Sequence, residues 1–291
     1  MLFTHKTELL YLEHARVYQE DGRVLYAQHN ERSPQRFNFP FRNAQVLALG
    51  TGTSITNRAA RLLAEEGVVL VFTGGEGTPY VMTGNLDYHP NEYAQGFIRR
   101  WMAPGGQLEM AKQLLRLRFD FTAAQGPGHP VSESALEHYR EKVEGASSVQ
   151  VLLGVEGDEV KNTVYRSCSQ HYLGDNTFRR SGAASRSEDH ANINERLNQG
   201  NNLAYAMAAG ALWHMGVPAF FPLIHGQTRN GGLIFDIADL IKDGVVAPWA
   251  FEMRDAQLTE AMGELRYRLK TRKADRYMIE AIRALSEGGQ P

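Results

Sequence analysis

The chain has 291 residues, of which 43% are hydrophobic, so it is long enough for one large domain or two medium ones with real cores. Its formal net charge of −2 and its pI near 6.6 argue against a protein whose whole surface binds nucleic acid nonspecifically, although a local basic patch remains compatible. Cys168 is the single cysteine, which excludes an internal disulfide and a multi-cysteine zinc site and favours a reducing compartment, the cytoplasm. The early charges and the lack of long apolar runs predict neither a secretory signal nor a membrane-spanning helix, so no membrane partner is expected.

The first part of the sequence is typical of strands. Short runs rich in β-branched or aromatic residues alternate with turn signals, and Asp21-Gly22 between two of these runs predicts a hairpin. The expected strands are residues 9–12, 15–18, 24–27, 45–49 and 68–72. The expected separators are Asp21-Gly22, Ser33-Pro34, Gly50 and Gly74-Gly75.

One helix interrupts these strands at residues 57–66, where Ser54 or Thr56 can cap its start and Gly67 ends it. After the polar stretch 85–90 the apolar period changes from two to about 3.6 residues. The predicted fold is therefore α+β, with a β-rich, β-sandwich-like domain at 1–86 and a larger all-α domain at 87–291. The expected helices of the second domain start with Tyr93, Phe97 and Trp101 at helical spacing and continue at 108–121, 132–144, 147–172, 193–215, 236–242 and 256–285.

A cluster of potential metal ligands lies between residues 225 and 242. Asp236 and Asp239 are three residues apart, so a helix would place both carboxylates on one face, and His225 would reach them across a glycine-bearing turn. An isolated pair of this kind is usually a solvated helix cap, and a lone histidine is usually structural. Here apolar residues surround both acids, and a buried carboxylate needs a cation. Oxygen ligands with one imidazole favour Mg²⁺ or Mn²⁺.

A third ligand must come from elsewhere in the chain. Glu156 follows an apolar run in a helical segment, but a glutamate near a helix start is common without any function. Asp158 and Glu159 stand beside it, and the residues alone do not choose between the three.

Four segments resemble one family, in its order and at similar spacing. They are residues 49–56 with 74–79, Leu153-Gly-Val-Glu156-Gly, residues 192–205, and His225 through Asp236-Ile-Ala-Asp239-Leu-Ile-Lys242. Together they resemble the CRISPR-associated spacer-acquisition integrase, particularly the version of type I-F systems. The resemblance covers nearly the whole chain, which is shorter than is usual for that subtype in the helices before Glu156.

The resemblance implies that Glu156, His225 and Asp239 are the metal ligands, with Asp236 in an additional acidic position of the catalytic site. It implies a homodimer built by the N-terminal domain. The implied partners are double-stranded DNA, as prespacer and as CRISPR repeat, and a small ferredoxin-like adaptation subunit, which can be fused to a helicase-nuclease. The implied reaction is metal-assisted transesterification, in which a DNA 3′-hydroxyl attacks a phosphodiester at the edge of the repeat.

Several cations are candidates for DNA contact. Arg229 and Lys242 flank the expected ligands and could neutralise the scissile phosphate, or they could be surface residues. Residues 261–285 contain seven basic against three acidic side chains, so Arg266, Arg268 and Lys270 could bind DNA phosphates, or the segment could be a solvated helical face.

Other readings of the sequence remain open. A plain metal-dependent nuclease would use the same ligands, and a DNA-architectural protein would have lost the chemistry. Asn192 and Asn194 lie in a segment of small residues that favours close helix packing, and they are weak candidates for DNA contact. The glycine-rich turns at 50–54 and 74–77 lack the Walker lysine, so ATP binding is not expected. Cys168 is expected to be a buried thiol.

Overall fold

The N-terminal part of the molecule consists of two four-stranded sheets that face each other. The computed structural model describes residues 8–30, 33–74, 79–84, 91–180, 187–226 and 231–289. One sheet has the strand order β1-β5-β7-β8, with β8 antiparallel to β7, and the other has the order β4-β3-β2-β6. The strands are β1 (Glu8–Leu12), β2 (Ala15–Glu20), β3 (Arg23–Asn30), β4 (Ser33–Phe39), β5 (Ala44–Leu49), β6 (Ser54–Ile55), β7 (Val69–Thr73) and β8 (Pro79–Thr83).

The sheet that contains β5 and β7 is buried on both faces. Along β5, Leu47 and Leu49 point into the core between the two sheets, which α1 (Asn57–Glu65) also covers. Val46 and Ala48 point the other way and join the core of the helical part. Because side chains alternate along a strand, an uninterrupted apolar run supplies both cores. The strand-rich part is thereby packed onto the helical part.

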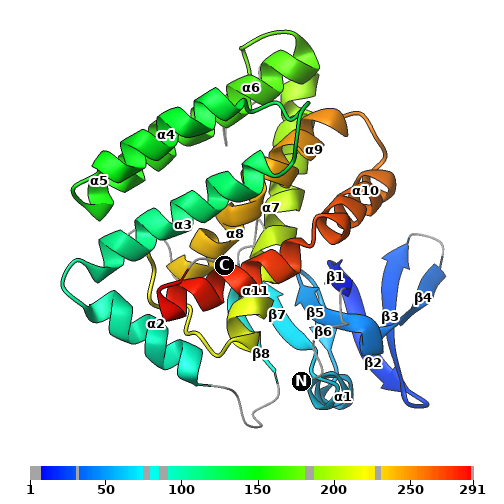
Figure 1. Cartoon of the computed structure of the whole chain (residues 1–291). Coiled ribbons are helices and arrows are strands. Elements are labelled where there is room, and N and C mark those ends of the chain that lie inside the picture. Colours follow the sequence, from blue (N-terminus) through cyan, green and yellow to red (C-terminus); the bar gives the residue numbers. More distant parts are fainter. Residues whose placement is uncertain are drawn as a thin grey trace.

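Helices form the rest of the described chain, and α8 lies in the middle of them, between α3, α7 and α11 (Figure 1). Its ten residues are all buried, as expected for a helix that is apolar apart from Asp236 and Asp239. The helices are α2 (Glu92–Met102), α3 (Gly106–Ala123), α4 (Glu133–Gly145), α5 (Val149–Gly154), α6 (Lys161–Leu173), α7 (Glu188–His214), α8 (Gly232–Ile241), α9 (Ala247–Glu252), α10 (Leu258–Thr271) and α11 (Ala274–Glu287); a short 3₁₀ helix, Phe41–Asn43, precedes β5.

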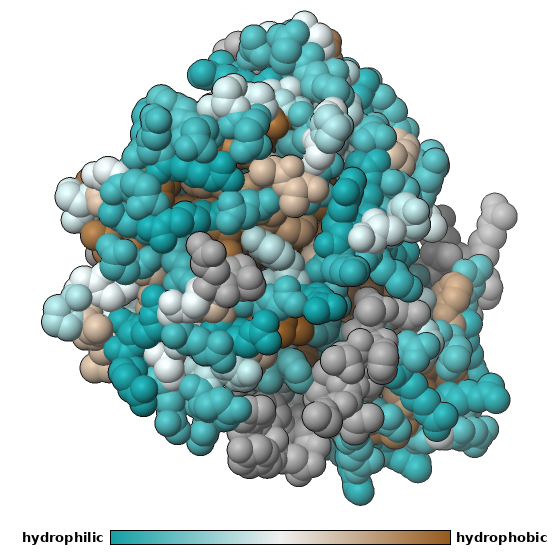
Figure 2. All heavy atoms as spheres, in the orientation of Figure 1, coloured by the Kyte–Doolittle hydropathy of each residue, from teal (hydrophilic) through white to brown (hydrophobic). Residues whose placement is uncertain are grey.

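The predicted fold class is confirmed, and so are several local signals. Asp21 and Gly22 both have positive φ, 48° and 72°, as a two-residue hairpin of the favoured hand requires. Thr56 caps α1 through its side chain, which accepts a hydrogen bond from the Ala59 N–H, and Gly67 follows the helix with φ of 70°. Within the described part of the chain no helix is long and apolar enough to cross a membrane. Hydrophilic residues cover most of the face drawn in Figure 2.

Three predicted elements were wrong in extent. Ser33-Pro34 is the start of β4 and not a separator; β4 is an edge strand, where a proline costs no ladder hydrogen bond. The single helix expected at 256–285 is two helices, because Lys273 adopts a left-handed conformation with φ of 51°. The helix expected at 147–172 is interrupted by a π-helical stretch, Val155–Val160. The boundary proposed at residues 86 and 87 lies outside the described residues.

Candidate metal centre

Three side chains from distant parts of the chain meet in the helical core. Glu156 lies in the π-helical stretch after α5, His225 in the loop before α8, and Asp239 on α8. One oxygen or nitrogen atom of each lies within 4.8 Å of the corresponding atoms of the others. Their exposed fractions are only 1%, 8% and 5%. The structure therefore brings together the three residues that the resemblance implied as ligands.

Asp236 holds the histidine and the loop that carries it. Its Oδ1 lies 2.7 Å from His225 Nδ1, and its two oxygens accept the backbone N–H groups of Leu223, Ile224 and His225 at 2.6 to 3.2 Å. These contacts occupy the carboxylate, so Asp236 lies behind the imidazole and not beside Glu156 and Asp239. With Nδ1 directed at Asp236, Nε2 is the nitrogen that faces Glu156 Oε2, at 3.8 Å, and Asp239 Oδ2, at 3.9 Å.

The electrostatics of His225 follow from this setting. Burial lowers the pKa of the imidazole, but the hydrogen bond to Asp236 and the negative charges of Asp239, Asp236 and Glu156 outweigh burial and raise the pKa above its ordinary value. In the absence of a cation the cluster thus favours a positive charge at this position.

Lys242 orients Asp239, one turn of helix before it. The lysine Nζ lies 2.5 Å from Asp239 Oδ1 and 3.2 Å from the Tyr205 hydroxyl, and it stands 4.3 Å from the centre of the Tyr205 ring. Burial lowers the pKa of Lys242, but Asp239 and the other partners raise it far above its ordinary value, so the ammonium stays charged. Asp239 Oδ2 remains directed towards His225 Nε2.

A buried arginine that the sequence reasoning missed orients Glu156. Arg118 of α3 donates from Nη1 to Glu156 Oε1 at 3.0 Å, and from Nε and Nη2 to the two oxygens of Asp243 at 2.5 and 2.9 Å. Its side chain is 3% exposed. Burial lowers the pKa of Arg118, but Asp243, Asp239 and Glu156 raise it well above the ordinary value, so the guanidinium is charged. Glu156 Oε2 is left facing His225.

Two π-helical stretches carry residues of this cluster. Val155–Val160 contains Glu156, and Lys242–Val246 contains both Lys242 and Asp243. A π turn fits one extra residue into a helix and so rotates the side chains that follow; such turns concentrate at functional sites. The chemistry of the site thus lies where the regular helix is interrupted.

The donor set fits a divalent cation. Mg²⁺ and Mn²⁺ both bind carboxylate oxygens. Mn²⁺ binds an imidazole nitrogen more readily than Mg²⁺ does. The separations of 3.8 and 3.9 Å are too long for hydrogen bonds and suit atoms that share an ion at roughly 2.1 Å from each. The described side chains of the cluster comprise four carboxylates and the two cations of Arg118 and Lys242, so one divalent ion offsets the remaining negative charge of this set.

Comparison with known proteins identifies the family. The model of the family described as CRISPR associated protein Cas1 matches residues 10–264. The chain belongs to this family. It is 34% identical to the CRISPR-associated endonuclease Cas1 of Pseudomonas aeruginosa (strain UCBPP-PA14), over 86% of the chain and 83% of that protein. The crystal structure of TtCas1 is similar, with 26% sequence identity and a TM-score of 0.71 over 97% of this chain and 98% of that one. The crystal structure of the TtCas1-DNA complex also has 26% sequence identity, with a TM-score of 0.70 over 96% of this chain and 91% of that one.

In this Cas1 family member a polar cavity of about 370 Å³ is lined by His225, Asp239 and Lys242 of the cluster. Its lining includes Arg179 and Arg180, and Arg180 donates to the backbone and side-chain oxygens of Asn194 and to Asn198 on α7. Asn194 is also a donor to the His190 carbonyl, at 2.9 Å, and is buried. Asn194 therefore has a structural role in α7 and anchors Arg180, in line with the close helix packing that the sequence of this segment predicts.

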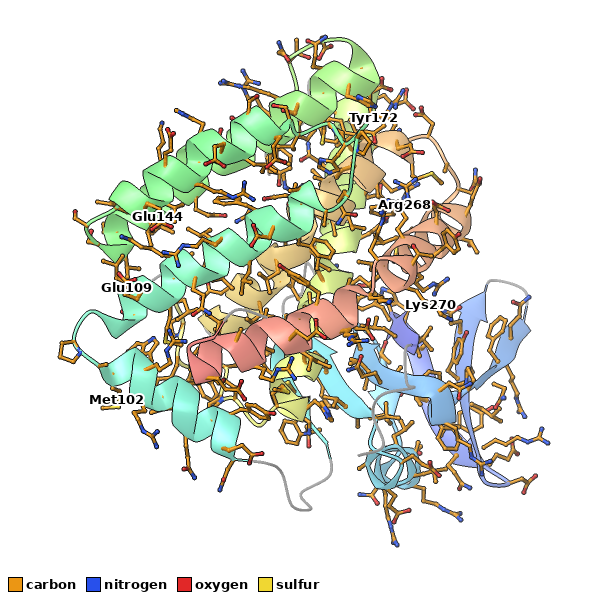
Figure 3. The ribbon with its side chains drawn as sticks, in the orientation of Figure 1. Met102, Glu109, Glu144, Tyr172, Arg268 and Lys270 are labelled. Atoms are coloured by element: carbon orange, nitrogen blue, oxygen red, sulfur yellow. The ribbon has the colours of Figure 1, made fainter. Side chains whose placement is uncertain are left out.

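The predicted DNA-binding cations differ in their surroundings. Arg268 forms ion pairs with Glu252 and Glu264 at 2.9 and 2.7 Å, which occupy its guanidinium. Arg266 and Lys270 are exposed and line a second cavity, of about 410 Å³, between α10 and the strand-rich part; Figure 3 shows Lys270 on the side of α10 next to the strands. Arg229 lies outside the described residues, as do the side chains of Asp158 and Glu159.

Cys168 is fully buried on α6, and burial, together with the charge of Asp243, raises the pKa of its thiol. A raised thiol pKa leaves less of the reactive thiolate at any pH, so a nucleophilic role is not supported.

Proposed function

We propose that this chain is a metal-dependent DNA endonuclease and integrase that inserts prespacer DNA into a CRISPR array. The arrangement of Glu156, His225 and Asp239 within 4.8 Å of one another carries the proposal. Membership of the Cas1 family supports it, as does the similarity to a Cas1 protein that is named an endonuclease and to one seen in complex with DNA.

In this proposal Glu156, His225 and Asp239 hold one Mg²⁺ or Mn²⁺. When bound, the ion polarises a phosphoryl oxygen and stabilises the oxyanion that forms as one DNA strand replaces another. Asp236 fixes the histidine tautomer that presents Nε2 to the ion, and Lys242 and Arg118 fix the two carboxylates. No covalent intermediate with the protein is needed, because the protein supplies position and charge.

The role proposed for Lys242 changes with its contacts. The short ion pair with Asp239 makes it a residue that orients a proposed ligand, whereas the sequence left open whether it contacts the scissile phosphate or lies on the surface. Arg179 and Arg180, which line the polar cavity together with His225 and Asp239, take over the proposed contact with the DNA backbone. Arg266 and Lys270 remain proposed DNA contacts on α10. The homodimer, the ferredoxin-like partner and the cytoplasmic location remain predictions from the sequence.

Replacing a ligand tests the proposal directly. Glu156→Ala, His225→Ala and Asp239→Ala should each reduce Mn²⁺-dependent strand joining by more than about 100-fold, because loss of outer partners alone commonly costs 10 to 100-fold. The assay incubates a short duplex with a supercoiled plasmid that bears the repeat and measures joined products. Glu137→Ala, an exposed acid on α4, is the matched control and should leave the rate unchanged.

The same assay separates the rival functions. Joined products from the unaltered protein support integration, whereas degradation without joining supports a plain nuclease. Binding without any Mn²⁺-dependent chemistry supports an architectural protein. Full activity in all three ligand variants contradicts the assignment of the site.

A further inference from the structure

We infer that Arg118 is a positioning residue that sets the orientation of Glu156 by tying it to Asp243. The inference rests on the proposed function of Glu156 as a metal ligand and names a residue on which that ligand depends. Arg118 belongs to α3, 38 positions before Glu156 and 125 before Asp243, so it joins three separate segments.

The two oxygens of Glu156 have different contacts. Oε1 accepts from Arg118 Nη1 at 3.0 Å, while Oε2 lies 3.8 Å from His225 Nε2, on the side of the proposed ion. The other two ligands show the same arrangement, since Asp239 is held by Lys242 and His225 by Asp236. Each proposed ligand thus has one atom fixed by a charged partner and another directed at the shared position.

Asp243 fixes the arginine in turn. Its two oxygens accept from Nε and Nη2 in a bidentate pair, which sets the plane of the guanidinium and thereby the direction of Nη1. Both acids lie on π-helical stretches, so a single planar group connects the two interruptions of the helices. A lysine could supply the charge of Arg118 but not three donors in this fixed geometry.

Two variants perturb this geometry, and the first of them leaves the net charge unchanged. Arg118→Lys keeps the charge and loses the bidentate geometry; Asp243→Asn keeps the arginine and weakens its anchor. Mn²⁺ binding to the full-length protein without DNA, measured by electron paramagnetic resonance of the free ion, should weaken by about 10 to 100-fold in both. In the strand-joining assay, the Mn²⁺ concentration that gives the half-maximal rate should rise by a similar factor. The maximal rate should return to that of the unaltered protein at saturating Mn²⁺.

Arg116→Lys is the matched control, because Arg116 lies on the same helix and forms a bidentate pair with Glu144 at the molecular surface. Figure 3 labels Glu144 at the end of α4. The Arg116→Lys variant should bind Mn²⁺ like the unaltered protein. Unchanged Mn²⁺ affinity in Arg118→Lys with weaker binding in Asp243→Asn would show a pure charge effect and overturn the inference. A lower plateau without a shift in Mn²⁺ dependence would show a merely structural role and overturn it too. Absence of Mn²⁺ binding to the unaltered protein would instead contradict the proposed function.

Discussion

Two arginines of this protein each meet three carboxylates, in opposite surroundings. Arg118 pairs with Glu156, Asp239 and Asp243, and all four side chains are at most 8% exposed. Arg140 on α4 pairs with Asp120, Glu133 and Glu137, whose side chains are 58 to 69% exposed. Each cluster includes one residue of α3, and these two residues are only two positions apart. Arg118 points into the core and Asp120 points to the surface.

The difference shows that the number of ion pairs says little about their importance. In water the Arg140 cluster is screened and its partners are already solvated. In the core the carboxylates of the Arg118 cluster have lost their water and depend on the cations beside them. A charge cluster that is costly to bury is retained where it has a task, and here the task proposed is to hold a metal ion.

Removing the buried arginine should have the largest effect. Arg118→Ala leaves three buried carboxylates without their shared cation and should lower the free energy of unfolding by about 3 to 5 kcal/mol. Urea unfolding in the presence of a chelator measures this, so that bound metal does not mask the loss. A decrease below about 1 kcal/mol would show that the buried cluster behaves like a surface one.

The sequence predicted one half of the site much better than the other. His225, Asp236 and Asp239 lie within 15 residues, so a helical period was enough to group them. Glu156 lies 69 residues before His225, and only the family resemblance selected it over its acidic neighbours. No spacing rule connects such distant segments, because the packing of α5 and α8 against α3 brings them together.

Arg118 and Asp243 were missed for different reasons. Arg118 follows Leu114 by four residues and Leu115 by three, so it lies on the apolar stripe of α3, and a cation at that place is a signal that could have been used. Asp243 follows Asp239 by four residues, a spacing that places both on one helix face, but the helix expected from the sequence ended at residue 242.

A glycine beside the buried cluster should show the next largest effect. A Cβ at Gly200 of α7 would stand 2.5 Å from Val246 Cγ1 and 3.0 Å from a Trp249 ring carbon, so α7 approaches the second π turn closely. Gly200→Ala should therefore destabilise the protein by about 1 to 3 kcal/mol through overpacking. Thermal unfolding of the chelated protein checks the value.

The control comes from the helix that carries Arg140. A Cβ at Gly145, the last residue of α4, meets nothing within 4 Å, so Gly145→Ala should be neutral or stabilise the protein by up to about 1 kcal/mol. Equal losses at Gly200 and Gly145 would mean that packing around the π turn is no tighter than at the surface.

The smallest effect is expected at Arg140, whose carboxylate partners are exposed. Arg140→Ala should lower the free energy of unfolding by only about 0.2 to 1 kcal/mol, since its three partners remain in water when the cation is lost. Salt sharpens the contrast, because at 1 M ionic strength the screening length falls to about 3 Å and surface pairs lose most of their attraction. Urea unfolding at low and high salt should therefore show the Arg140→Ala difference disappear while the Arg118→Ala difference persists. If both differences vanished together, the Arg118 cluster would have to be reached by solvent ions, and its burial could not be the reason for its larger contribution.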